Sequence, residues 1–187
     1  MELYNIALFA HIIGAIVIVG MGFFTPFMMG GLTRTPTVAG VREWAGALQK
    51  ISKMGGPFAG LVLLSGIFMV ISKHSWTTPW IMVSLVLFVI AGGIASGVLD
   101  PAVGKIVAAA DETPDGPVPD ELRALTTDTR MHDFEAMLFG VDMAIVFMMT
   151  VKPGLVGSLV TVAAGLALGG VRVLLAHRKH AAPAVAG

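Results

Sequence analysis

The feature that most constrains this chain is a set of apolar runs, each long enough to cross a lipid bilayer. One of them extends from Phe134 to Val151. A spanning helix needs about 20 mostly apolar residues, because the hydrocarbon core is roughly 30 Å thick and each helical residue rises about 1.5 Å. Of the 187 residues, 56% are hydrophobic and only 13% are charged. This balance is not that of a soluble domain and predicts an integral membrane protein.

Five such runs are predicted to cross the membrane, at about residues 5–28, 57–72, 79–99, 134–151 and 155–176. The predicted fold is therefore an all-α, polytopic transmembrane helical bundle that forms a single domain over residues 1–180. We expect Pro26 to bend the inner end of the first span and Asp100-Pro101 to close the third. The small residues of 181–187 predict a disordered tail.

Two connecting segments are long and polar. Within residues 30–56, apolar side chains recur at helical spacing opposite charged ones, at Val41, Trp44, Leu48 and Ile51. The pattern is typical of a short helix lying on the membrane surface, or of an amphipathic connector packed on the bundle. Residues 103–130 surround the Pro- and Gly-rich stretch ETPDGPVPDE, which cannot hold a helix. We expect this second segment to be a mobile linker.

The orientation follows from the basic residues, because an odd number of spans places the two termini on opposite sides. With the N-terminus outside, the inner side receives Arg34, Arg42, Lys50, Lys53, Lys105, Arg123, Arg130, Arg172, Arg178 and Lys179. The outer side receives only Lys73 and Lys152. The positive-inside rule therefore predicts the N-terminus outside and the C-terminus inside.

Composition and motifs exclude several classes of function. The formal net charge is zero, which predicts no nucleic-acid partner. The chain has no cysteine, so disulfides, thiolate metal sites and thiol catalysis are excluded. It contains no nucleotide-binding loop, nucleophile elbow or zinc motif. We therefore do not expect the chain to be an enzyme on its own.

Asp142 lies near the midpoint of the fourth run. An acidic residue there costs roughly 2.5–3.5 kcal/mol and must find a partner inside the bundle. Counting residues inward from the outer ends places His11, Ser65 and Thr161 at a similar depth, so the four side chains form one polar layer if their helices face each other. A pair of His11 and Asp142 would be a structural hydrogen bond, a proton relay, or the contact that orients a haem or metal ligand.

Two further groups of side chains are candidates for a role. Thioether and imidazole groups near the outer side suit copper(I) or haem iron, at Met69, Met82, Met148, Met149 and His74. No repeat spacing accompanies them, and methionine is also ordinary packing in apolar helices. At the inner boundary an ion cluster that fixes helix ends is predicted for Asp100, Glu135 and Arg172, near Arg130, His132 and His177.

The GxxxG patterns at Gly93/Gly97 and Gly165/Gly169 predict faces for close helix contact. These faces suit association with other membrane subunits or with another copy of the chain.

Three stretches carry a resemblance to a known family: LYNIALFAHIIGAIVIVG, then SGIFMV followed by a tryptophan and SLVLFVIAGGIASGVLDP, and then FMMTVKPG. Together they resemble a family of bacterial predicted integral membrane proteins of unknown function. That family is distantly similar in layout to the membrane domain of copper-resistance D proteins. The resemblance covers most of the chain from Leu3 to Gly154 and implies a multi-pass protein of the bacterial inner membrane. It implies no activity.

The function predicted from these observations is binding rather than turnover. The leading hypothesis is a small non-catalytic inner-membrane subunit of a respiratory or other redox complex, with haem b bound through His11. The first alternative is a proton- or metal-coupled transporter that uses Asp142. The second is a purely structural membrane bundle.

Overall fold

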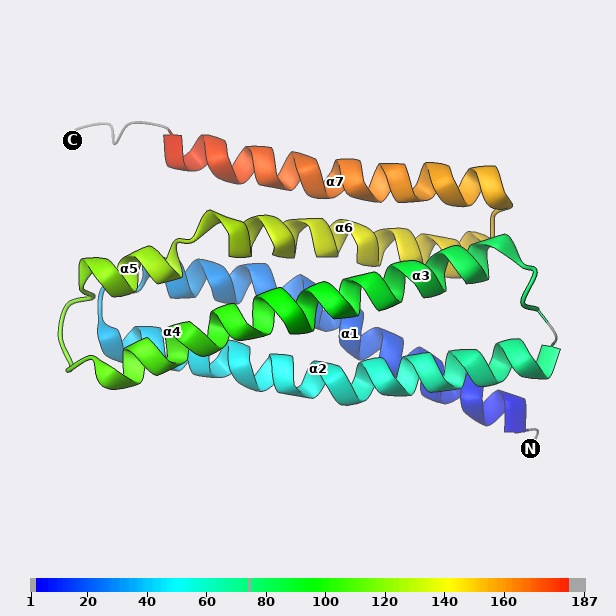
Figure 1. Ribbon diagram of the computed structural model, residues 1–187, viewed down its shortest axis with the longest axis horizontal. Coiled ribbons are helices and arrows are strands. Elements are labelled where there is room, and N and C mark those ends of the chain that lie inside the picture. The colour runs from blue at the N-terminus through cyan, green and yellow to red at the C-terminus, as the bar shows by residue number, and fades with distance from the viewer. Residues whose placement is uncertain (1–2, 74, 182–187) are drawn as a thin grey trace.

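A computed structural model describes residues 3–73 and 75–181 and, for residues 176 and 178–181, the backbone alone. In this part of the chain the protein is entirely helical, apart from one isolated bridge between Thr37 and Pro117. The elements are α1 (Leu3–Arg34), α2 (Val38–Lys73), α3 (Pro79–Ile94), the π-helical η1 (Ala95–Leu99), α4 (Asp100–Glu112), α5 (Asp120–Thr126), α6 (Thr129–Val151) and α7 (Leu155–Ala181). They form one elongated bundle (Figure 1).

Five helical stretches are long and apolar enough to cross a membrane: Leu3–Arg34, Val38–Lys73, Pro79–Glu112, Asp120–Val151 and Leu155–Leu175. This confirms the prediction of an all-α, multi-pass membrane protein. The stretches run alternately up and down, so the start of α1 and the end of α7 lie at opposite ends of the bundle (Figure 1).

The helices are longer than a bilayer is thick. With 32 residues in α1 and 36 in α2, these helices measure about 48–54 Å, against a hydrocarbon core of roughly 30 Å. The surplus lies at one end, which we call the domain end: the C-terminal part of α1, the N-terminal part of α2, and α4 and α5. The other end, which we call the turn end, holds the short connections 74–78 and 152–154.

Two cations lie over aromatic rings at the turn end. The Lys73 Nζ atom is 4.8 Å from the ring centroid of Tyr4, and the Lys152 Nζ atom is 5.9 Å from the Trp80 ring. Amphipathic aromatic rings and long basic side chains are typical of the boundary between hydrocarbon and headgroups. These pairs therefore mark where the helices leave the bilayer at this end.

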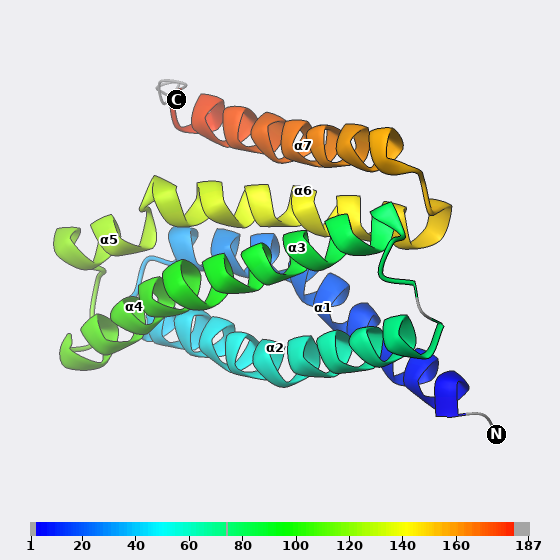
Figure 2. The ribbon, with the colours of Figure 1, turned by 45° about the vertical axis from the view of Figure 1, so that its right-hand side comes forward.

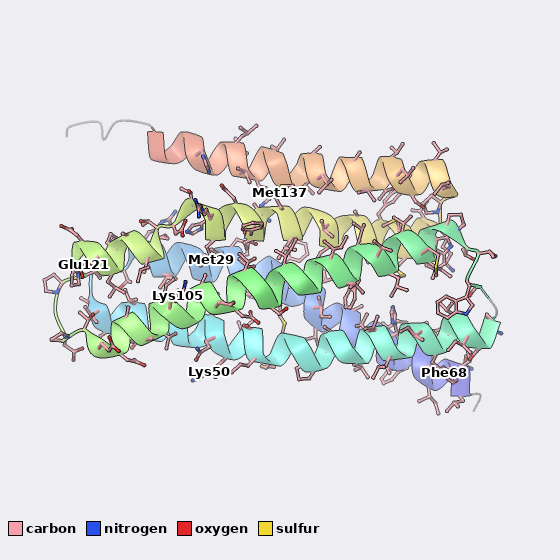
Figure 3. All side chains as sticks on the ribbon, viewed as in Figure 1. Met29, Lys50, Phe68, Lys105, Glu121 and Met137 are labelled. Atoms are coloured by element: carbon pink, nitrogen blue, oxygen red, sulfur yellow. The ribbon has the colours of Figure 1, made fainter. Side chains whose placement is uncertain are left out.

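The hydrophobic core lies at the domain end, where α1, α2, α4 and α5 converge and residues such as Met29 gather with flanking charges (Figure 3). Its most buried members are Leu32, Val38, Val41, Ala45, Ile106 and Ala110. The Trp44 ring also packs here, against the backbone of Gly31 and edge-on to Phe27. The stretch around Val41 is thus an amphipathic connector packed on the bundle, and the alternative of a helix on the membrane surface is wrong.

The polar segment after the third span is ordered into helices. The sequence led us to expect that Asp100-Pro101 would end the third helix, but the chain stays helical through this pair. The amide of Asp100 donates to the carbonyl of Ala95 five residues earlier. This π-helical turn leads into α4, and Pro101 occupies the first turn of α4, where a proline is tolerated. Only residues 113–119 are irregular, between α4 and α5.

Two arginines hold this segment in place. Arg42 donates to the carbonyls of Ala110 and Thr113 and pairs with Asp115. Arg123 donates to the carbonyl of Thr33, in the last turn of α1, at 2.9 Å and to that of Thr35, just beyond the helix, at 2.8 Å. Both guanidinium groups therefore satisfy carbonyls that a helix end leaves without partners. The expectation of a mobile linker over 103–130 is wrong for this reason.

Within the membrane portion the helices approach closely where a glycine faces a neighbour. A Cβ atom on Gly14 would lie 2.7 Å from Val62, so α1 and α2 cross in close contact. A Cβ atom on Gly140 would overlap the carbonyl oxygen of Gly165, and one on Gly169 would lie 2.9 Å from the carbonyl oxygen of Ala136. The second GxxxG face is therefore used inside the molecule, where it docks α7 on α6 (Figures 1 and 2).

Candidate functional site

His11 lies on α1 and faces α2. Its Nδ1 atom is 2.9 Å from the carbonyl oxygen of Val62 and 3.4 Å from the hydroxyl of Ser65. A carbonyl can only accept, so Nδ1 carries the proton and donates it, and the second ring nitrogen, Nε2, keeps a free lone pair. Gly66 makes room for the ring, because a Cβ atom there would lie 3.2 Å from Cε1 of His11.

Asp142 lies on α6 and faces a different part of α1. Its Oδ2 atom would be 3.3 Å from a Cβ atom on Gly22, eleven residues along α1 from His11. Eleven residues correspond to about 16 Å of helix. In the part of the chain that the structure describes, no hydrogen bond reaches Asp142.

The predicted polar layer therefore does not form as a unit. His11 and Ser65 meet, but the pair of His11 and Asp142 is not formed, and Thr161 donates to the Gly157 carbonyl within its own helix at 2.8 Å. The reason is geometric: residue counts place side chains at a depth, whereas helix rotation and crossing angle decide which of them face each other. α1 crosses the bundle obliquely (Figure 2).

A second polar group is built by α6 and α7. Arg172 Nη2 lies 3.5 Å from Glu135 Oε2, and these side chains are 27% and 10% exposed. The guanidinium carbon is 4.3 Å from the centroid of Phe139, whose ring meets Phe23 of α1 edge-on at 5.1 Å. The other terminal nitrogen of Arg172, Nη1, is buried and has no hydrogen-bond partner among the described residues.

The predicted inner ion cluster is thus divided into separate pairs. Glu135 and Arg172 are joined, whereas Asp100 accepts a hydrogen bond from Ser52 of α2. His177 pairs with Asp133 at 2.9 Å, and the Nε2 atom of His132 lies 3.5 Å from the carbonyl oxygen of Thr126. Arg130 is the second residue of α6, and its amide donates a hydrogen bond to the side chain of Asp128, which caps the helix.

The family described as "Predicted integral membrane protein (DUF2269)" matches residues 5–153. The chain belongs to this family. The match includes α1 to α6, so both His11 and Asp142 lie inside it, whereas α7 and Arg172 follow it. No curated protein and no solved structure matches the chain significantly.

The methionine candidates come from three helices, α2, α3 and α6, in this member of the DUF2269 family. Met148 is fully buried, and its sulfur accepts a hydrogen bond from Ser84 of α3 at 3.8 Å. Met69, Met82 and Met149 are half-buried. His74 lies outside the described residues. Among the residues that the structure describes, no three His, Asp or Glu side chains are grouped to hold a metal ion.

Sequence reasoning missed the groups that place the two candidate residues. The partner of His11 is a main-chain carbonyl, and every residue has one, so no side-chain pattern signals it. Gly66 and Gly22 receive His11 and Asp142, and neither belongs to a GxxxG pattern. The one available signal was the 3.6-residue period: Glu135, Phe139 and Asp142 are spaced by four and three residues and share one face of α6.

Proposed function

We propose that this protein is a small non-catalytic subunit of a respiratory or other redox complex in the bacterial inner membrane, with His11 as a ligand of haem b. The N-terminus faces outward and the domain end faces the cytoplasm. The observation that carries the proposal is the hydrogen bond from His11 Nδ1 to the carbonyl of Val62.

This bond is the arrangement that a ligating histidine requires. Ligating histidines almost always donate their other ring nitrogen to a carbonyl, carboxylate or water, which fixes the tautomer and the ring plane. In His11 the fixed tautomer leaves Nε2 with its lone pair, and within the described residues no hydrogen bond involves that atom. An imidazole nitrogen of this kind is the usual protein ligand of haem iron.

The remainder of the molecule supports a binding role. The connections between spans are short or folded into the domain end, so the described residues form no separate domain that could hold a catalytic site. The Gly93/Gly97 face of α3 and η1 is open, since no described atom lies within 4 Å of a Cβ atom built on either glycine. That face is available for a neighbouring subunit, as small residues favour helix association in lipid.

The visible spectrum tests the haem proposal. Protein purified from haem-replete cells should show a Soret band and reduced-minus-oxidised bands, and His11→Ala should remove them. His177→Ala is the matched control, because His177 is half exposed in a pair with Asp133 and its loss should leave the spectrum unchanged. A colourless wild-type preparation, or a spectrum that survives His11→Ala, contradicts the proposal.

A second candidate function is proton- or metal-coupled transport, which the position of Asp142 favours. Asp142 lies near the middle of a span, and its carboxyl group has no hydrogen-bond partner among the described residues. Such a group has an unfavourable free energy in the bilayer, and intramembrane acidic residues commonly mark ion and proton pathways. If neither His11→Ala nor Asp142→Asn changes any spectrum or flux, the third alternative, a structural bundle, is favoured.

A further inference from the structure

The unpaired nitrogen of Arg172 sits at the meeting point of three helices. Arg172 comes from α7, the Glu135 and Phe139 side chains that it contacts come from α6, and Phe139 meets Phe23 of α1. Nη1 is buried without a partner in the described part of the chain. A buried donor of this kind costs about 1–3 kcal/mol unless a water molecule or an ion satisfies it.

Two carboxyl groups share the face of α6 against which this guanidinium packs. Glu135 and Asp142 are seven residues apart on one face of α6, about 10 Å along the helix axis. Phe139, over whose ring the guanidinium lies, falls between them in sequence. Arg172 is therefore paired with Glu135 at one end of this face, and its buried Nη1 atom has no partner there among the described residues.

We propose that Arg172 Nη1 holds ordered water that joins Glu135 and Asp142 into one path, along which protons pass between the domain end and the middle of the bilayer. A water molecule bound there would accept from Nη1 and donate to Glu135, and further water molecules along the same face of α6 would reach Asp142. Gly22 leaves the space beside Asp142 open, because it carries no side chain toward Oδ2.

The proton balance of this path is simple. Glu135 takes a proton from water at the domain end. As Glu135 releases its proton to the first of the bound water molecules, the last of them releases one to Asp142, and the reverse sequence returns the proton. No electron moves, and Arg172 keeps its own protons throughout because a guanidinium does not deprotonate in proteins. Arg172 is a positioning residue that holds the water and balances the charge of the carboxylates.

The neighbouring helices offer no other ionisable group at this place. Within α1 the ionisable residues are Tyr4, His11 and Arg34, and His11 is bonded to Val62. α3 and η1 carry none. On α7 the next described ionisable side chain is His177, which pairs with Asp133. The path thus depends on Glu135, Asp142 and Arg172, and it stands whether or not His11 binds haem.

Hydrogen exchange at the Asp142 carboxyl tests the path in the full-length protein reconstituted in lipid. Infrared difference spectra across the accessible pH range identify the Asp142 carboxyl band as the one lost in Asp142→Asn. In the wild type this band should move to its deuterated position as soon as the buffer is changed to D₂O. Glu135→Gln and Arg172→Lys should lose the fast exchange, whereas Asp133→Asn should keep it. Arg172→Lys keeps a cation beside Glu135, so a purely structural role would leave the exchange rate unmoved.

Thiol labelling gives an independent readout, since the chain has no cysteine of its own. The Asp142→Cys variant should react with a small charged thiol reagent, because the reactive thiolate forms only where water reaches it. The control is Val146→Cys, whose site lies one turn further along α6 and is 38% exposed on the apolar surface. It should remain unreactive. Slow exchange in the wild type, absence of any titrating Asp142 band, or equal inertness of the two cysteine variants would each overturn the proposal.

Discussion

The domain end and the membrane portion are held together by different forces, although the same helices run through both. At the domain end, Leu32, Val38 and Val41 are completely buried, and arginines satisfy the last carbonyls of α1 and α4. In the membrane portion few side chains are buried, and large apolar residues such as Phe9, Ile16 and Leu64 are exposed on the surface. There the closest contacts join backbones at Gly140 and Gly165.

The difference reflects the solvent that each region meets. In water, the hydrophobic effect buries apolar side chains in a core. Lipid tails are as apolar as the side chains, so in the bilayer the hydrophobic effect does not favour their burial. Helices in lipid are held instead by close van der Waals packing, for which glycine allows the shortest approach. The domain end thus resembles the core of a water-soluble protein, built on the ends of membrane helices. Substitutions of the same kind should therefore change the stability of the two regions differently.

The largest expected contrast is in exposure to the two sides of the membrane. Because the chain has no cysteine, single cysteines can be introduced without background. Thr77→Cys and Lys152→Cys, at the turn end, should be labelled in intact cells by an impermeant reagent. Asp115→Cys, at the domain end, should be labelled only after permeabilisation. Labelling of Asp115→Cys in intact cells would mean that the domain end faces outward.

The next contrast is between two glycine faces. Gly140→Leu should detach α7 from α6, at a cost at or above the roughly 3 kcal/mol that overpacking usually reaches, because even its Cβ atom would overlap Gly165. Gly93→Leu is the matched control and should leave thermal stability in detergent unchanged, since its face is open. If Gly93→Leu instead abolishes co-purification of a partner or of a second copy while the fold persists, that face is the docking surface. Equal stability of both variants would refute the packing of α7.

A smaller loss is expected when the aqueous core is opened. Leu32→Ala should lower the free energy of unfolding by about 3 kcal/mol, as is usual for a fully buried leucine. Leu125→Ala, on α5, should cost clearly less, because 38% of that residue is already exposed. Limited proteolysis of the 113–119 connection in mild denaturant measures both changes. If the two variants are equally susceptible, the domain end is not a cooperative core.

Much of the fold followed from local sequence, and the exceptions share a cause. Length and apolarity were sufficient to find five spans, because a helix is the only way for a single segment to satisfy its backbone in lipid. The amphipathic pattern around Val41 left a surface helix and a packed connector open, and the turn residues of 113–119 indicated an irregular stretch but not the helices α4 and α5 on either side of it. The prediction that the helix ends at Asp100-Pro101 was wrong because a helix continues past such a pair when its next turns can pack against another part of the protein. Here Ile106 and Ala110 of α4 pack against α2 in the hydrophobic core.

The candidate site was less accessible to sequence reasoning. His11, Glu135, Asp142 and Arg172 could be selected, because ionisable residues in apolar runs are few and expensive. Their contact partners could not be predicted from the sequence, since these depend on nearby glycines and on a main-chain carbonyl. From the sequence alone, Glu135 and Arg172 were predicted to belong, with Asp100, to an ion cluster that fixes helix ends. In the structure Arg172 also faces Phe139 and keeps one buried nitrogen without a protein partner.

The sequence by itself determined that this protein is helical, crosses the membrane five times and carries a carboxyl group in the hydrocarbon region. These properties depend on the transfer of each segment from water to lipid, which is a sum over its own residues. Only the tertiary structure decided that His11 bonds to Val62, that Asp142 faces Gly22, and that one glycine face is filled while the other is open. These contacts depend on the rotation and crossing angle of each helix. In lipid, different rotations and crossing angles leave nearly the same apolar surface out of water, so they differ little in free energy from this term. The decision therefore falls to backbone contacts and polar groups that only the assembled bundle brings together.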